Sequence, residues 1–216
     1  MSKKNVLHNF EKIDTEEKAY WLGFLYADGN VSKSEDKIEL SLAEVDLKHI
    51  QKFKEFMGIE NKICYREQQK AYRISFRSQS CKQDLIDKGC VPAKSLILKF
   101  PNEEQVPKEL IRHFIRGYFD GDGWFTNTEK CFQTGIIGTK EFIEGTFKYL
   151  EENNIKTTCK IFNKGNVFKY NLNSYYDVKK FLNWIYKDSN IYLDRKYEHY
   201  LDFINNGSKY HKTPQE

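Results

Sequence analysis

Two stretches of this chain, Trp21-Leu-Gly-Phe-Leu-Tyr-Ala-Asp-Gly29 and Ile115-Arg-Gly-Tyr-Phe-Asp-Gly-Asp-Gly123, share one pattern. Each is rich in apolar and aromatic residues, carries a glycine at its third position and ends with Asp-Gly. The two aspartates of these endings, Asp28 and Asp122, are 94 positions apart. Because the repeat occurs in only two copies, it predicts two related half-domains rather than a solenoid.

The composition is that of a folded protein without a strong charge bias. Aromatic residues make up 15% of the 216 residues, which argues against extensive disorder, and the net charge of +4 is a weak indication of a polyanionic partner. The five cysteines form no C-x-x-C pair and are interpreted as reduced thiols. No signal segment follows Met1, and no stretch approaches the length of a membrane span. We therefore expect a soluble intracellular protein without membrane association, in a bacterial or phage-infected cytoplasm or in an organelle.

The same order of helices and strands is predicted after each repeat. In the first half, the capping-box pattern of Asp14 and Glu17 predicts the start of a helix that runs to about Ala27. Gly29 is expected to supply the positive φ of the helix exit. Alternating apolar residues then predict two strand pairs, and Asp46 is expected to cap the helix between them. The order that results is α-β-β-α-β-β-α.

A proline-containing linker separates the two halves. We assign an N-terminal half-domain to residues 1–104, a C-terminal half-domain to residues 105–204, and a polar tail to residues 205–216. In the second half, the strands are expected near residues 124–126, 132–136, 155–162 and 167–172, and the later helices over residues 139–150, 175–186 and 193–204.

The repeated Asp-Gly pairs carry the functional signal. Asp-Gly is a common turn dipeptide, so either pair alone is explained simply as a helix end. A carboxylate at a helix C-terminus, however, faces the negative end of the helix dipole, and two neighbouring carboxylates repel each other unless a cation lies between them. Gly23 and Gly117 would let the two helices approach closely. The sequence therefore predicts that Asp28 and Asp122 meet at a pseudo-two-fold axis and bind a divalent metal.

Both stretches resemble the motif of the LAGLIDADG homing endonucleases, in the double-motif form that acts as a monomer. The matching positions are Gly23, Leu25, Ala27, Asp28 and Gly29 in the first stretch, and Gly117, Asp120, Asp122 and Gly123 in the second. The predicted order of elements also agrees with that family. The resemblance implies an α+β fold of two pseudo-symmetric half-domains, with the motif helices packed at their interface and a saddle of antiparallel sheets over DNA.

The resemblance also implies an activity. A protein of this family would hydrolyse phosphodiester bonds on both strands of a long, asymmetric DNA site and leave a staggered break. Asp28 and Asp122 would bind Mg²⁺, together with the backbone carbonyls of Ala27 and Gly121. Mn²⁺ or Ca²⁺ would substitute for Mg²⁺ in binding.

Basic residues near the metal assist catalysis in this family. Lys94 and Lys196 occupy the corresponding regions of the two halves, with Arg195 as a further candidate. The motif's sixth position holds Asp120 in the second copy and Tyr26 in the first, so we treat Asp120 as non-catalytic.

The outward faces of the sheets are the expected DNA-reading surface of this fold. Alternation with the buried positions assigns these side chains, which include many types that hydrogen-bond to base edges. An outward strand face is polar in most proteins, so the set as a whole is a better indication than any one member. The expected DNA contacts are Lys37, Glu39, Ser41, Arg73, Ser75, Arg77, Thr126, Gln133, Lys156, Thr158, Lys160, Lys169 and Asn171.

Other functions stay open. A protein of this fold would alternatively bind group I intron RNA as a splicing cofactor, or bind DNA without cleaving it, although the presence of both aspartates favours a nuclease. An unrelated α+β protein whose glycine-containing helices only pack is a third possibility. The chain has neither the first residue nor the last residues that protein splicing requires, so we expect an intron-encoded or free-standing protein rather than an intein.

Overall fold

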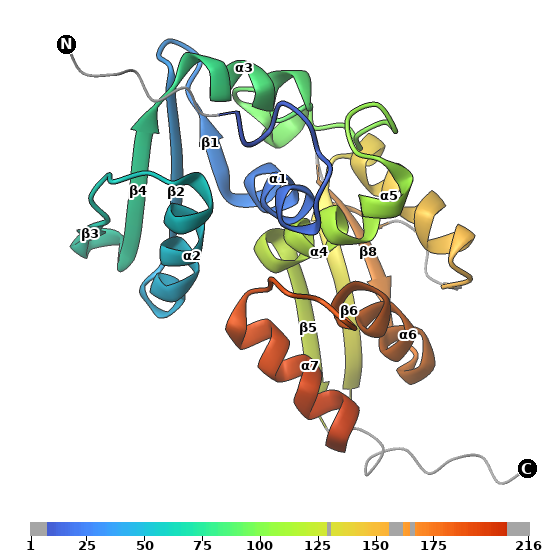
Figure 1. Cartoon of the computed structure of the whole chain (residues 1–216). Helices are drawn as coiled ribbons and strands as arrows, with labels where there is room; N and C mark the ends of the chain where they lie inside the picture. Colours follow the sequence, from blue (N-terminus) through green and yellow to red (C-terminus); the bar gives the residue numbers. More distant parts are fainter. Residues whose placement is uncertain (1–7, 129–130, 156–161, 165–166, 207–216) are drawn as a thin grey trace, which may run out of the picture.

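The computed structural model describes residues 8–128, 131–155, 162–164 and 167–206, which form two similar halves around a central pair of helices (Figure 1). The elements of the first half are α1 (Glu16–Asp28), β1 (Gly29–Val31), β2 (Lys37–Ala43), α2 (Leu47–Met57), β3 (Cys64–Arg66), β4 (Ala71–Arg77) and α3 (Gln79–Asp87). The elements of the second half are α4 (Ile111–Asp122), β5 (Gly123–Thr128), β6 (Cys131–Gly138), α5 (Lys140–Glu152), β7 (Phe162–Lys164), β8 (Val167–Leu172), α6 (Tyr175–Tyr186) and α7 (Asp194–Asn206).

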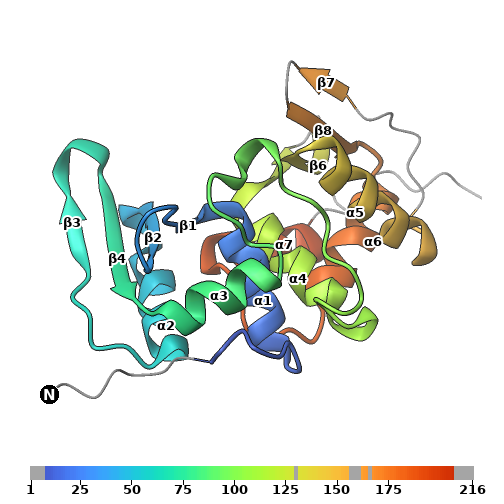
Figure 2. The same cartoon turned by 90° about the horizontal axis from the view of Figure 1, so that it is seen from above.

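Each half contains a four-stranded antiparallel sheet, and the two sheets have the same topology. The strand order is β1-β2-β4-β3 in the first and β5-β6-β8-β7 in the second. Seen from above, the sheets lie on either side of α1 and α4 (Figure 2). The predicted α+β fold of two pseudo-symmetric halves with antiparallel sheets is therefore confirmed. The predicted domain boundary at residues 104 and 105 falls in the connection between α3 and α4 and stays a prediction.

The motif helices α1 and α4 pack with their backbones in contact. A Cβ atom added to Gly23 would lie 2.0 Å from the carbonyl oxygen of Phe114, and one added to Gly117 would lie 1.9 Å from that of Tyr20. Only glycine fits at either position. Residues 19–26 of α1 are buried on all sides, as expected of a helix that is apolar around its whole circumference.

The structure corrects three local predictions in the first half. The N-cap of α1 is Thr15, whose side chain accepts a hydrogen bond from the amide of Lys18, while Asp14 forms an ion pair with Lys18 instead. Gly29 does not have a positive φ: its φ of −73° and ψ of 148° are extended, because the chain passes directly from α1 into β1. Asp46 stands at the N-cap of α2 but makes no side-chain capping bond.

The helices cover the inner faces of the sheets. α2 and α3 pack on the first sheet, and α5 and α6 on the second. None of the helices in the described part of the chain combines the length and apolar character that crossing a bilayer requires.

Candidate functional site

The two motif aspartates lie at neighbouring helix ends. Asp28 is the last residue of α1 and Asp122 the last residue of α4. At this end the helices touch, since a Cβ atom added to Gly121 would lie 2.3 Å from the Cβ of Ala27 and 3.1 Å from Oδ2 of Asp28. The Asp28 carboxylate therefore lies against the backbone of the residue that precedes Asp122, as the paired repeats predicted.

The surroundings of both carboxyl groups make their ionisation less favourable. Asp28 is open to solvent on one side, but the protein atoms around its other sides remove part of its hydration. This desolvation, together with the negative charge of Asp122, raises the pKa of Asp28 to about 6. Burial also raises the pKa of Asp122, against the opposing effect of Lys94 and Lys196. Within the described residues, neither carboxylate forms an ion pair with a side chain of the protein.

The two lysines expected to assist catalysis occupy equivalent places. The Nζ of Lys94 donates a hydrogen bond to the carbonyl oxygen of Gly29, directly after the first motif aspartate. The Nζ of Lys196 donates to the carbonyl oxygens of Gly123, at 2.6 Å, and Phe119, at 2.5 Å. Burial lowers the pKa of Lys196 to about 8. Each lysine is thus held beside a helix end and contributes positive charge there, and among the described residues neither forms an ion pair with a carboxylate.

The donor atoms at this place fit a hard divalent cation. Mg²⁺ is commonly bound by one or two carboxylates, with waters and substrate phosphates completing its coordination. Asp28 and Asp122 supply two carboxylates, and the carbonyls of Ala27 and Gly121 belong to last helical turns, whose carbonyls lack intrahelical partners. Among the described residues, no group of three or more His, Cys, Asp or Glu side chains gathers into a fuller ligand set.

Hollows border both lysines. A pocket of about 190 Å³ is lined by Lys94, Asp122, Ala27 and Tyr118, among others. The hydroxyl of Tyr118 donates to the carbonyl oxygen of Ile137 at 2.9 Å and also lowers the pKa of Asp122. A second pocket, of about 440 Å³, lies beside Lys196 and is lined further by Gly123, Trp124, Phe125, Arg195 and His199.

In the first sheet, the expected DNA contacts share one face. Register pairs Lys37 with Arg77, Glu39 with Ser75 and Ser41 with Arg73, and the alternating residues between them are buried on the helix side. The cations of this face are, however, ion-paired. The carboxylate of Glu39 lies 2.8 Å from the Nζ of Lys37 and 3.2 Å from the guanidinium of Arg73. The guanidinium of Arg77 lies 2.8 Å from the carboxylate of Glu35.

In the second sheet, register places Thr126, Gln133, Lys169 and Asn171 on one face. Sequence reasoning missed Trp124, which shares this face and packs against Gly135, with Nζ of Lys169 5.3 Å from its ring centroid. The alternation that selected Thr126 would also have selected Trp124. The remaining expected contacts, Lys156, Thr158 and Lys160, lie outside the described residues.

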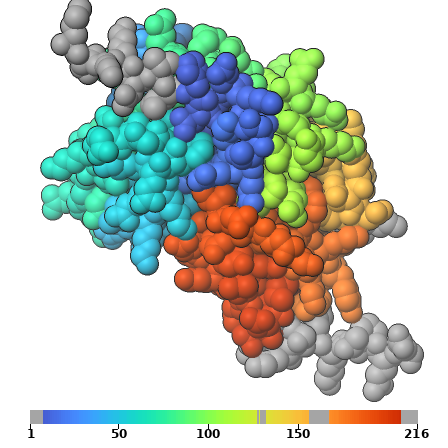
Figure 3. Space-filling view, viewed as in Figure 1, coloured from blue at the N-terminus to red at the C-terminus, as the bar shows by residue number. Residues whose placement is uncertain are grey.

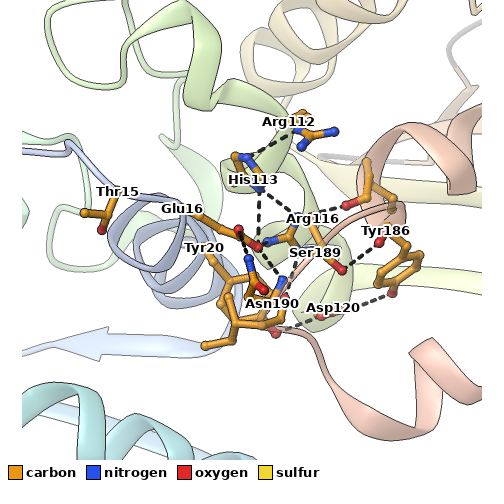
Figure 4. Close-up of polar contacts among 12 residues, drawn as sticks. Thr15, Glu16, Tyr20, Arg112, His113, Arg116, Asp120, Tyr186, Ser189 and Asn190 are labelled. Atoms are coloured by element: carbon orange, nitrogen blue, oxygen red, sulfur yellow. Dashed lines mark hydrogen bonds and ion pairs between the residues drawn. The ribbon is translucent and has the colours of Figure 1, made fainter.

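A buried arginine joins the two halves below the site. Arg116 of α4 has no exposed surface, and its guanidinium donates to Glu16 at 2.7 Å and to the carbonyl oxygens of Ile185, at 2.8 Å, and Ile191, at 2.9 Å (Figure 4). Glu16, at the start of α1, also accepts hydrogen bonds from Asn190. This network fixes the first turn of α1 to α4 and to the segment that leads into α7.

Asp120 belongs to the same buried region rather than to the motif ends. Its carboxylate accepts hydrogen bonds from the hydroxyls of Tyr20, at 2.7 Å, and Tyr186, at 2.5 Å, and from the amide of Leu193, at 2.8 Å (Figure 4). Tyr26, at the corresponding position of the first motif, donates to the carbonyl oxygen of Lys88. Both residues therefore tie a motif helix to the segment that leads to a lysine of the site.

Comparisons with known proteins agree with this fold. Residues 109–186 match the family model of the LAGLIDADG-like domain. The LAGLIDADG meganuclease I-AabMI bound to uncleaved DNA matches over 88% of this chain and 90% of its own, with a TM-score of 0.59 and 13% identity. The I-SmaMI LAGLIDADG homing endonuclease bound to cleaved DNA matches over 91% of each chain, with a TM-score of 0.59 and 14% identity.

Two further matches are to proteins whose names do not describe an endonuclease. The N-terminal LAGLIDADG domain of WhiA matches over 92% of this chain and 97% of its own, with a TM-score of 0.56 and 18% identity. The probable translation initiation factor IF-2 of Methanocaldococcus jannaschii is 25% identical over 171 residues, which are 74% of this chain but 13% of that protein. The chain thus spans a small part of this relative. The structural matches show that the described chain has the LAGLIDADG fold in both halves.

Proposed function

We propose that this protein with a LAGLIDADG fold is a metal-dependent endonuclease that cuts both strands of a specific double-stranded DNA site. The observation that carries the proposal is the meeting of Asp28 and Asp122 at the touching ends of α1 and α4. Two carboxylates at helix C-termini that form no ion pair among the described residues favour a bound cation, because both the helix dipoles and their mutual repulsion disfavour them otherwise.

Mg²⁺ is the cofactor that we propose. Asp28 and Asp122 would hold it with the carbonyls of Ala27 and Gly121, and Mn²⁺ or Ca²⁺ would bind at the same place. When bound, the metal would lower the pKa of a water nucleophile and stabilise charge on the phosphate and on the leaving oxygen.

The protein's own groups would position and stabilise the reacting phosphates. Lys94 and Lys196 each carry a positive charge beside one motif helix end, where charge would develop on a phosphate. Because carbonyl oxygens hold these ammonium groups in place, little rearrangement would be needed during the reaction. Two lysines, one on each half, fit a reaction on two strands and hence a staggered break.

Double-stranded DNA is the partner that we propose. The sheet faces that carry Arg73, Arg77, Lys169 and the other expected contacts would read a long site in the major groove. The halves differ in these side chains, so the site would be asymmetric. One chain carries both aspartates, both lysines and both sheets, and we therefore propose that it acts as a monomer, in intron homing.

A second candidate is a DNA-binding protein of the same fold that does not cleave. The match to the WhiA domain, whose name does not describe a nuclease, favours it. Binding of intron RNA as a splicing cofactor is the further alternative. The presence of both motif aspartates favours the nuclease over both alternatives.

Cleavage of a randomised DNA pool tests the proposal. When the pool is carried on circular plasmids, double-strand cleavage should give linear DNA with Mg²⁺ and none with EDTA. Sequencing the ends of the linear DNA should reveal the target. Asp28→Asn and Asp122→Asn should each abolish double-strand cleavage while DNA binding persists. Asp87→Asn is the matched control, since Asp87 is exposed at the end of α3, and it should cleave normally. Full activity of either motif variant would refute the mechanism, and sequence-specific binding without cleavage would favour the second candidate.

A further inference from the structure

The segment that carries Lys196 is anchored on the opposite half of the molecule. Arg195 lies next to Lys196, and its Nε donates hydrogen bonds to both carboxylate oxygens of Asp46, at 2.9 and 3.2 Å. Asp46 is buried and belongs to the N-terminal half. In the space-filling view, the red C-terminal segment lies directly against the blue and cyan N-terminal half (Figure 3).

A second contact strengthens this anchor. The Nζ of Lys52, in α2, lies 2.5 Å from the carboxylate of Asp194, the first residue of α7, and donates to the carbonyl oxygen of Tyr192 at 3.2 Å. The residues on both sides of Leu193 are therefore held by the first half, immediately before Lys196. Lys196 in turn reaches back to the end of α4, in the second half.

The segment that carries Lys94 has the mirrored arrangement. The hydroxyl of Thr139, in the C-terminal half, donates a hydrogen bond to the carbonyl oxygen of Leu98. Leu98 follows the short helical turn Lys94–Leu96, whose end is closed by a hydrogen bond from the amide of Ile97 to the carbonyl oxygen of Lys94, at 3.0 Å. Leu98 is itself buried, so this anchor fixes the chain close to Lys94.

Asp46 and Thr139 occupy equivalent positions of the two halves. Each is the N-cap residue of the helix that follows the second strand of its sheet, α2 or α5. An aspartate at this position usually accepts a hydrogen bond from its own helix. Asp46 accepts none from α2, and its carboxylate serves Arg195 instead. Thr139 shares its hydroxyl between the amide of Phe142, at 3.2 Å, and Leu98 of the other half.

We propose that Asp46 and Thr139 are positioning residues that act across the two halves: Asp46 holds Lys196 in place through Arg195, and Thr139 holds Lys94 in place through Leu98. The inference rests on the proposed nuclease function. It means that each lysine reaches its working position only when the two halves are docked. Cutting of the strand that depends on Lys196 therefore requires Asp46 of the N-terminal half. Cutting of the strand that depends on Lys94 requires Thr139 of the C-terminal half.

Strand-resolved cleavage tests this crossed arrangement. With each strand of the target labelled separately, Lys94→Met and Lys196→Met identify the strand that depends on each lysine. Asp46→Asn keeps the side-chain volume and should lower kcat for the Lys196-dependent strand by about ten- to a hundredfold, because a small misplacement of a catalytic group has effects of this size. KM should stay unchanged. Thr139→Val should do the same to the Lys94-dependent strand.

Rescue variants separate positioning from general destabilisation. The double variant that combines Asp46→Arg with Arg195→Asp exchanges the two charges and should restore most of the kcat lost at the Lys196-dependent strand. The conservative change Thr139→Ser should keep most of the kcat at the Lys94-dependent strand. Glu141→Gln is the control, since it removes an exposed ion pair with Lys99, and it should leave both strands unaffected. The proposal is overturned if Asp46→Asn slows the Lys94-dependent strand, or slows both strands equally.

Hydrogen exchange distinguishes failure of this inference from failure of the proposed function. If the wild-type protein cleaves no DNA, the proposed function fails, and the anchor can still be measured. Amide exchange in residues 192–198, followed by mass spectrometry, should be at least about tenfold faster in Asp46→Asn if the anchor holds this segment. Unchanged exchange in this segment would overturn the positioning role whatever the cleavage result.

Discussion

Replacing Gly117 with alanine tests how tightly the motif helices are packed. The new Cβ would lie 1.9 Å from the carbonyl oxygen of Tyr20 and 2.8 Å from the amide nitrogen of Phe24. Real Cβ atoms keep at least 3.0 Å from such atoms, and the backbone of α1 cannot turn aside. The helices must therefore separate locally by about 1 Å, a gap that forfeits about a quarter to a half of the dispersion attraction between facing atoms.

This separation sets the expected loss of stability. Overpacking a core usually costs about 1–3 kcal/mol, and a clash of backbone with backbone lies at or beyond the upper end of that range. We expect the free energy of unfolding to fall by about 4 kcal/mol, which lowers the Tm by about 8–16 °C in a chain of this size. Urea unfolding followed by circular dichroism, with thermal scans beside it, measures both quantities.

Three further variants test this prediction more closely. Gly23→Ala should cost about as much, because its Cβ would lie 2.0 Å from the carbonyl oxygen of Phe114. The double variant should cost far less than the sum, since one separation of the helices accommodates both methyl groups. Gly58→Ala is the control: its Cβ would meet nothing within 4 Å, and only the positive φ of 62° opposes it, at a cost of about 1–2 kcal/mol. Additive losses in the double variant, or a loss at Gly117 no larger than at Gly58, would refute the reasoning.

Three further predictions concern charged groups. Burial lowers the pKa of His49 from 6.5 to about 3, so below pH 6.5 the unfolded chain binds a proton at this side chain and the folded protein does not. The free energy of unfolding should therefore be lower by about 3 kcal/mol at pH 4.5 than at neutral pH. Urea titrations of His49→Gln should not show this loss. Arg116→Met should lower the free energy of unfolding by about 3–5 kcal/mol, because Glu16 and two backbone carbonyls lose their buried hydrogen-bond donor. Lys140→Met, at an exposed site, should leave the free energy of unfolding unchanged in the same assay. The pKa of Asp28 is raised from 3.8 to about 6, so its ionisation lowers stability as the pH rises through this window; Asp28→Asn should have a higher Tm than the wild type at pH 7.5 in EDTA and lose that advantage at pH 3.5.

Local patterns in the sequence were sufficient for the framework. The period-two runs predicted β2 and β4 and assigned Lys37, Ser75 and the other outward residues to one face, which the register confirms. The two repeats predicted that Gly23 and Gly117 lie between touching helices, and the backbone distances confirm it. These features depend on residues that are close in sequence or on a repeat that is visible in it.

One of the details that the sequence does not reveal depends on a distant partner, and two are local. Asp46 has the residue type of an N-cap, but Arg195, 149 positions away, takes its carboxylate, and no pattern in the sequence connects the two. The capping-box pattern predicts Asp14 as the start of α1, whereas Thr15 caps the helix; both residue types suit that role. Gly29 was given a positive φ because glycine often ends helices that way, whereas here a Cβ would lie 2.6 Å from the carbonyl oxygen of Leu25. The glycine is needed for space and not for its dihedral angles.

The two anchors between the halves differ in what they require of an exchanged partner. Thr139 donates to the backbone carbonyl at position 98, which every residue type provides. A C-terminal half taken from a relative therefore needs only a hydroxyl at the position that corresponds to Thr139. The Asp46–Arg195 contact joins two side chains and must be matched on both sides. In a chimaera made by recombining halves, the first anchor would therefore form with almost any donor, whereas the second would form only with a donor that keeps an arginine before its lysine. Of these two anchors, only the Asp46–Arg195 contact thus restricts which halves can be recombined.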